Sequence, residues 1–290
     1  MSAITETGIY QLSMDYYQAD PCPVASLSSG IAKLLVTRSP LHAWMAHPRL
    51  NPEYEKRERA TFDLGSAAHS CLFEDCNSLV VLDAADWRTK SSQEFRDNAR
   101  AEGKIPILQK QFDMIHAMGI VARKVLRESA DLQIDLTSGR AEESFIWRED
   151  DIWLRARLDW NDPALGVILD YKTLVGSANP NNMARYAYSM GWDVQSSFYC
   201  RGFSRLHPNA KLPKFIFIAQ ETDPPYAVSF VGMEGTFRAL GDDKVEQAIR
   251  LWRQCMKAGK WPGYTDRVVY PDPPAWATLE WEENQECKPL

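Results

Sequence analysis

Two acidic residues and a lysine end two short apolar runs, and their types suit metal-assisted hydrolysis of a phosphodiester. Residues 167–173 read VILDYKT, which places Asp170 two residues before Lys172. Alternate side chains of a strand share a face, so Asp170 and Lys172 should point the same way at a strand end. Asp159 ends a similar run eleven residues earlier. Two such carboxylates can hold a divalent cation, with the lysine beside an activated water.

The elements that would carry these residues form a run of strands. Residues 161–166 read NDPALG, which is typical of a turn, so the runs ending at Asp159 and at 173 should form a hairpin. A further run at 142–147 precedes them, and three successive strands predict an antiparallel meander. Residues 214–221 and 227–231 predict a later strand pair.

Helices are expected around these strands, because apolar residues recur at helical spacing in several segments. Ser28 or Ser29 should begin the first helix and Ser39-Pro40 the second. The two serines either only cap their helix or mark an N-terminus whose N–H groups bind phosphate. Further helices are predicted at 62–73, 108–126, 192–199 and 237–257.

The composition is that of an ordinary globular protein, with 45% apolar and 25% charged residues among 290. A net charge of -6 excludes a global basic field. A nucleic-acid enzyme of this charge needs a local channel lined by arginine and lysine.

Six cysteines occur at irregular spacing without a C-x-x-C pair, which favours reduced thiols over a zinc or iron–sulfur site. No signal-peptide pattern is present, and no apolar run approaches the roughly 18 residues typical of a membrane span. We therefore expect a cytoplasmic protein without a membrane partner.

Five elements in a fixed order give the sequence a family resemblance. They are Gly65-x-x-x-His69, Glu142, Asp159, Asp170-x-Lys172 and Gln195-x-x-x-Tyr199. This order resembles the PD-(D/E)XK nuclease superfamily, and most closely its RecB-like and RecE-like branch. Residues 27–30 (LSSG), 39–40 (SP) and 261–264 (WPGY) look like the catalytic domain of the RecE (exonuclease VIII) type. The resemblance covers about residues 17–276.

The resemblance implies an α/β (α+β) fold with a restriction-endonuclease-like core. A central mixed sheet should be flanked by helices, with a helical N-terminal region. Residues 1–25 would be a lead-in, 26–276 one exonuclease domain, and 277–290 a C-terminal tail. The proline-rich residues 261–276 should wrap over the surface.

The resemblance also assigns roles to residues. His69, Asp159, Asp170 and the carbonyl of Tyr171 would bind Mg²⁺, for which Mn²⁺ should substitute. Lys172 would orient the attacking water. Gln195 and Tyr199 would hold the catalytic strand or contact DNA, and Glu142 is preferred over the adjacent Glu143 as the upstream acid.

The activity implied is Mg²⁺-dependent degradation of linear double-stranded DNA, 5′→3′, which leaves 3′ single-stranded tails for recombination. A single-strand annealing protein (RecT-like) would be the partner. A toroidal homo-oligomer, trimer or tetramer, would enclose the duplex in a basic bore. Arg155 and Arg157 share the Asp159 face and could line that bore.

Two alternatives stay open. One is a structure-specific or single-strand nuclease of the same fold (Cas4-like), against which the absence of a four-cysteine cluster argues. The other is a catalytically silent DNA-binding module, against which the intact Asp170-x-Lys172 argues.

Overall fold

A central sheet organises the fold, which we describe from a computed structural model over residues 2–55, 60–74 and 76–286. Within these residues the sheet has seven strands, and β2 pairs with β6 beside the main order β1-β5-β6-β7-β8-β9. Their bounds are β1 Gly8–Gln11, β2 Leu27–Ser28, β5 Arg140–Glu149, β6 Ile152–Asp162, β7 Val167–Leu174, β8 Lys214–Glu221 and β9 Val228–Gly232.

The predicted meander is present, because β5, β6 and β7 pair in antiparallel fashion in chain order. The predicted strand pair is also present as β8 and β9. β7 and β8 run parallel, which requires the long helical connection between them. The sheet is therefore mixed but mostly antiparallel, and the predicted α/β class with helices on both faces is confirmed.

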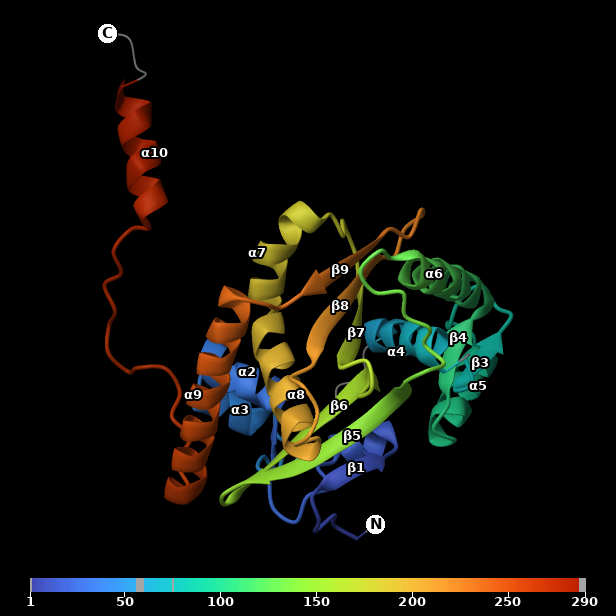
Figure 1. The fold of residues 1–290 in the computed structure, drawn as a ribbon, viewed down its shortest axis with the longest axis horizontal. Coiled ribbons are helices and arrows are strands. Elements are labelled where there is room, and N and C mark those ends of the chain that lie inside the picture. The colour runs from blue at the N-terminus through green and yellow to red at the C-terminus, as the bar shows by residue number, and fades with distance from the viewer. Residues whose placement is uncertain (1, 56–59, 75, 287–290) are drawn as a thin grey trace.

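Helices cover both faces of the sheet (Figure 1). One face carries α2 Ser29–Thr37, α3 Pro40–Met45, α7 Pro180–Met190, α8 Trp192–Leu206 and α9 Thr236–Ala258. The other carries α4 Ala60–Phe73 and α6 Gln109–Glu128, and beside them lie α5 Lys90–Ala101 and a small sheet of β3 Leu79–Leu82 and β4 Ile105–Leu108. The short helix α1 Met14–Gln18 follows β1.

Alternation along β7 explains why the sheet is the middle layer. Ile168 and Leu174 belong to the core beneath α8, whereas Leu169 and Tyr171 belong to the core beneath α4 and α6. A strand that is apolar on both faces has to be covered twice. β7, the strand that carries Asp170 and Lys172, is therefore held between two separate hydrophobic cores.

The N-terminal residues contribute more structure than the expected lead-in. β1 pairs with β5 in antiparallel fashion, with Gly8 opposite Ile146 and Gln11 opposite Glu143. The boundary expected at residue 26 therefore does not coincide with an edge of the sheet.

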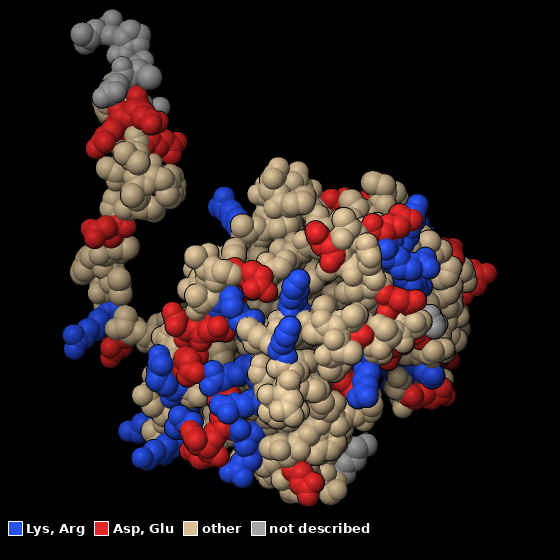
Figure 2. Space-filling model, in the orientation of Figure 1, with Lys and Arg blue, Asp and Glu red and all other residues tan. Residues whose placement is uncertain are grey.

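The C-terminal residues depart from the expectation that 261–276 wrap over the surface. The chain packs on the body only as far as Tyr264: Leu41 N donates to the carbonyl of Pro262 at 3.0 Å, and the Trp261 ring lies 5.3 Å from that of Trp252. Beyond this point the chain leaves the body, and α10 Ala275–Glu286 projects from it (Figures 1 and 2). The expectation of wrapping was wrong there, because these residues are almost all exposed.

The expectation that all cysteines are reduced thiols is wrong for one pair. Cys71 and Cys76 form a disulfide. The turn after α4 brings them together, since the Cys76 N–H donates to the Ser70 carbonyl at 3.0 Å. Cys22, Cys200 and Cys255 are free and buried, and Cys287 lies outside the described residues. A short local loop closes without any C-x-x-C motif, which is why spacing alone did not indicate it.

None of the described helices combines the length and the apolar content that crossing a membrane requires.

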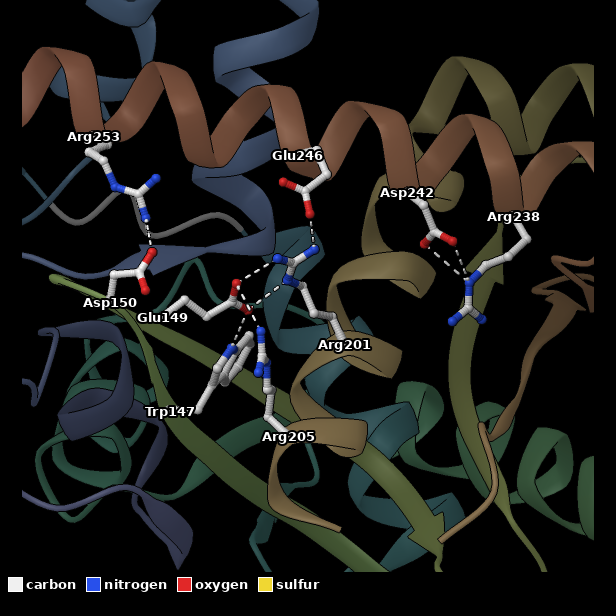
Figure 3. Close-up of polar contacts among 9 residues, drawn as sticks. All are labelled: Trp147, Glu149, Asp150, Arg201, Arg205, Arg238, Asp242, Glu246 and Arg253. Atoms are coloured by element: carbon white, nitrogen blue, oxygen red, sulfur yellow. Dashed lines mark hydrogen bonds and ion pairs between the residues drawn. The ribbon is translucent and has the colours of Figure 1, made fainter. Parts of the chain in front are cut away.

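An ion-pair network ties α8 to the sheet and to α9 (Figure 3). Glu149, at the end of β5, is nearly buried and accepts hydrogen bonds from Arg201 at 2.5 and 2.6 Å and from the Trp147 indole at 3.1 Å. Arg201 also donates to Glu246 of α9 at 2.6 Å. Burial alone would raise the pKa of Glu149, but the hydrogen bonds from Arg201 and Trp147 outweigh it and lower that pKa.

The variant Arg201→Ala should lower the free energy of unfolding by about 3 kcal/mol, because it leaves the Glu149 carboxylate buried without its main partner. Since the pKa of Glu149 is lowered in the folded state, the loss should be full at neutral pH and shrink as the pH falls through that pKa. Urea unfolding at several pH values measures it.

Arg253→Ala is the matched control. Arg253 pairs with Asp150 and Asp151, which are largely exposed, so its loss should cost less than about 1 kcal/mol. Equal effects of the two variants would contradict the role given to the Glu149 network.

Candidate metal centre

Three acids from adjacent strands occupy one row of the sheet. Ala141 pairs with Trp160 and Glu143 with Leu158, so Glu142 of β5 faces Asp159 of β6. The pairing of Trp160 with Leu169 places Asp170 of β7 at the next position, opposite Asp159. The β6–β7 pairing ends just before this row, but the Asp170 carboxylate is close enough to Asp159 to raise its pKa. Glu142 and Asp159 have ligand atoms within 4.8 Å of each other, so the three carboxylates are neighbours.

The sheet forks at this row. The β6–β7 pairing runs from Asp162 and Val167 only to Trp160 and Leu169. Further along, β6 pairs instead with β2, with Ser28 opposite Arg155. At the fork, Asp159 Oδ2 accepts a hydrogen bond from the Tyr171 backbone N–H at 2.8 Å, so a side chain replaces the missing strand partner. α2 follows β2 directly and therefore begins beside the fork.

A basic side chain lies beside each of the two outer acids. Lys172 Nζ lies 2.5 Å from Asp170 Oδ1, and Arg157 Nε donates to Glu142 Oε2 at 2.6 Å. Lys172 and Arg157 each lie two residues from an acid of the first row, which is the period of side chains on one face. The two outer carboxylates thus have a cation each, and the central one does not.

His69 reaches the central carboxylate from α4. Its Nδ1 lies 3.3 Å from Asp159 Oδ2, and its Nε2 is 2.8 Å from the carbonyl oxygen of Tyr171. Ala67 and Ala68 are buried beside it on the same helix, so small side chains allow α4 to approach the sheet closely. The carbonyl oxygen of Tyr171 is thus in contact with the imidazole of His69, and its expected role as a metal ligand stays a prediction.

Gln195 and Tyr199 approach from α8, one helical turn apart. Gln195 Nε2 donates to Asp170 Oδ2 at 2.5 Å, which fixes the carboxylate from the side opposite Lys172. The Tyr199 hydroxyl is hydrogen-bonded to the side chain of Ser29, the first residue of α2. Gln195 contacts the catalytic strand itself, whereas Tyr199 links α8 to the helix that begins at the fork.

Burial and the neighbouring charges together set the pKa values in the site. Burial and then the nearby Asp170 carboxylate raise the pKa of Asp159 well above its usual range. Burial lowers the pKa of His69, so its imidazole is neutral at pH 7 and keeps a lone pair for a ligand. Burial disfavours the charged form of Lys172, but Asp170 and Asp159 outweigh it and raise the lysine's pKa.

The residues present fit a divalent cation. Ligand atoms of His69, Glu142 and Asp159 all lie within 4.8 Å of one another. Asp170 Oδ1 is buried and accepts no hydrogen bond of acceptable geometry, despite the nearby ammonium. Mainly oxygen donors with one imidazole suit Mg²⁺ or Mn²⁺. A dication among these groups would remove the repulsion that raises the pKa of Asp159.

The surroundings of Glu142 and Glu143 differ and favour Glu142 as the acid of the site. Glu143 is 5% exposed and contacts Arg140 and Asn161, away from the site. Glu142 points into the site from a left-handed backbone conformation with φ of 58°. A glutamate rarely adopts this conformation, and such strain is common at functional positions.

The expectation that Arg155 lines a DNA channel was wrong. Arg155 is only 4% exposed, and its guanidinium donates to the Ser26 carbonyl at 2.9 Å and lies 3.2 Å from Asp20. Arg157 is also engaged inside the protein, with Glu142 and the carbonyl of Leu12. Sequence alternation identified their shared face but not the N-terminal segment that covers it.

Ser28 and Ser29 lie at the start of α2, as predicted, with Ser28 as the N-cap residue. The Ser28 side chain makes no capping hydrogen bond. The role of Arg157 as the partner of Glu142 was missed, although its two-residue spacing from Asp159 was a usable signal.

Glu142→Gln and Glu143→Gln form a matched pair that tests the metal centre without any activity measurement. Mn²⁺ should raise the unfolding temperature of the wild type, because it binds only the folded site. Glu142→Gln should weaken Mn²⁺ affinity about tenfold or more, in the range seen when groups supporting a metal are lost. Glu143→Gln should leave it unchanged. Equal Mn²⁺ responses in both variants would contradict this centre.

The similarity to known proteins lies in the fold and in the family. No curated protein matches the sequence. A solved structure described as a candidate exonuclease from Eubacterium rectale superposes with a TM-score of 0.60 at 15% identity, over 93% of this chain and 98% of that one, and so shares the fold. Residues 35–272, well over half of the chain, match the family described as a PDDEXK-like domain of unknown function (DUF3799). The predicted superfamily is thereby confirmed, and the chain belongs to this PDDEXK-like family.

Proposed function

We propose that the protein is a divalent-metal-dependent nuclease that hydrolyses phosphodiester bonds in DNA. The observation that carries the proposal is the fork, where His69, Glu142 and Asp159 have ligand atoms within 4.8 Å of one another and Asp170, paired with Lys172, lies close to Asp159. Mg²⁺ is the expected ion, with Mn²⁺ as a substitute. His69, Asp159, Asp170, Glu142 and the carbonyl of Tyr171 would hold it.

When bound, the ion polarises the scissile phosphate and lowers the pKa of a bound water. Lys172 stays cationic at neutral pH because the acids raise its pKa. Its ammonium can therefore donate a hydrogen bond to the attacking water or to a phosphate oxygen. Gln195 holds Asp170 from the other side and fixes the direction of the carboxylate.

The start of α2 is where we place the DNA backbone. Helix N-termini offer free N–H groups and a partial positive charge to phosphate. Lys33, on the same helix, is close enough to Lys172 to have its pKa lowered, after burial, by that second charge. These groups would supply positive charge to a phosphate in a chain whose net charge is -6. This supports DNA binding by Ser28 and Ser29 and replaces the buried Arg155 in that role.

The finer assignment is an exonuclease that degrades linear double-stranded DNA 5′→3′, works with a RecT-like annealing protein and encloses the duplex in a toroidal homo-oligomer. The family resemblance supports it, and the neighbouring structure is described as a candidate exonuclease. The Cas4-like alternative lacks support, because the described cysteines are a disulfide pair and three buried single thiols.

The test uses linear 5′-phosphorylated duplex DNA, a circular duplex and single-stranded DNA, each with Mg²⁺. Progressive loss from 5′ ends is expected for the wild type on linear duplex alone. Nicking of the circular duplex, or faster cleavage of single-stranded DNA, would favour the structure-specific or single-strand alternative. A wild-type protein that cleaves none of the three substrates would contradict the proposed nuclease activity.

Two variants separate metal binding from chemistry. Asp170→Asn should lose both Mn²⁺ stabilisation and cleavage. Lys172→Gln should keep Mn²⁺ binding, since its ammonium is not a ligand, yet lose at least about a hundredfold in rate, a typical size for a lost proton-transfer or charge-stabilising group. Full activity of Lys172→Gln would contradict the role given to this lysine.

A further inference from the structure

A C-terminal arm, residues 265–286, leaves the body without packing on it (Figures 1 and 2). It carries large apolar side chains that are 58–88% exposed, namely Val268, Val269, Tyr270, Trp276, Leu279 and Trp281. A helix as short as α10 is marginal on its own in water. A concentration of exposed apolar side chains marks a binding surface, so the arm needs a partner.

The apolar residues of α10 do not form one stripe. At roughly 100° per residue, Trp276 and Leu279 lie on one side of the helix and Trp281 lies well away from them. A helix lying flat on a surface would leave one of these indoles in water. The arm therefore suits a site that receives an indole in a pocket.

The charge of the arm indicates which kind of surface it can bind. The arm, residues 265–286, contains one arginine, Arg267, and six acids, namely Asp266, Asp272, Glu280, Glu282, Glu283 and Glu286. Such a segment repels DNA and acidic lipid surfaces. It fits a protein surface with an apolar floor and a basic rim.

The body of this protein carries such a surface at the end of α9. A pocket of about 280 Å³ has a floor that includes Ile152, Trp252 and Met256, and Arg253 and Lys257 stand at its rim beside Asp151. Arg250 and Lys260 add positive charge along the same end of the helix. Lysine and arginine gather over this part of the molecule in Figure 2.

The arm does not reach the pocket of its own subunit. In Figure 1 the arm leaves the body beside α9, and α10 lies beyond the end at which α9 begins. The pocket is lined by residues 252, 253, 256 and 257, near the other end of that helix. Pro271, Pro273 and Pro274 precede α10 directly, and proline-rich segments are extended and resist reversal.

We infer that the arm of one copy docks in the α9 pocket of a second copy, with Trp276 or Trp281 as the anchor. Different surfaces meet in such a contact, so it is head-to-tail, and repetition closes it into a ring when the rotation allows. The inference concerns assembly and holds whether or not the protein cuts DNA.

Light scattering during gel filtration tests it on the full chain. The wild type should have a mass above the 33.0 kDa of one chain, and a chain truncated after Tyr264 should be a monomer. Trp276→Ala with Trp281→Ala should act like the truncation. Because these residues are exposed, unfolding temperatures should not fall.

Exchanging charges between the arm and the α9 pocket tests whether these two surfaces contact each other. Lys257→Glu should weaken self-association about tenfold or more by placing an acid where the acidic arm docks. Adding Glu280→Lys and Glu283→Lys to that variant should restore most of the affinity. Monomeric wild type, an oligomeric truncated chain, failure of the exchange, or association only with a different protein would each overturn the inference. Mass is measured rather than cleavage, so an inactive enzyme does not affect the result.

Discussion

Repulsion among three carboxylates is the constraint on which the rest of this structure depends. Glu142, Asp159 and Asp170 stand in one row across adjacent strands, and the pKa of the middle one is raised because burial and its neighbours disfavour its charge. Like charges at this spacing destabilise a fold unless cations accompany them. Lys172 and Arg157 neutralise the outer acids, and the centre remains for a dication.

Helices on both faces of the sheet position side chains at the fork. α4 brings His69 to one side of the fork and α8 brings Gln195 to the other. Separate hydrophobic cores hold these helices against the two faces of the sheet. The Glu149–Arg201 network then fixes α8 between the sheet and α9 (Figure 3). Because β7 contributes to both cores, the position of Asp170 is set from two directions.

Local periodicity predicted the meander and most of the long helices, and the family resemblance indicated the site residues. Periodicity missed β1, which is only four residues long and gains its strand character from pairing with β5 some 130 residues away. It missed α10, which follows three prolines within four residues and is rich in acids. The fork itself was unpredictable, since it depends on β2 replacing β7 beside β6. Alternation likewise placed Arg155 on a face without showing its depth, because the covering residue, Asp20, is far off in sequence.

The fork also has a consequence for motion. The backbones of β6 and β7 are not hydrogen-bonded to each other beyond Trp160 and Leu169. At the fork, a hydrogen bond from the Tyr171 N–H to the Asp159 carboxylate connects the two strands. Amide protons along this opening should exchange with solvent sooner than those of the paired segment beside it. The place where an ion would bind is thus also where the pairing of β6 and β7 ends, and a bound ion would link these two strands.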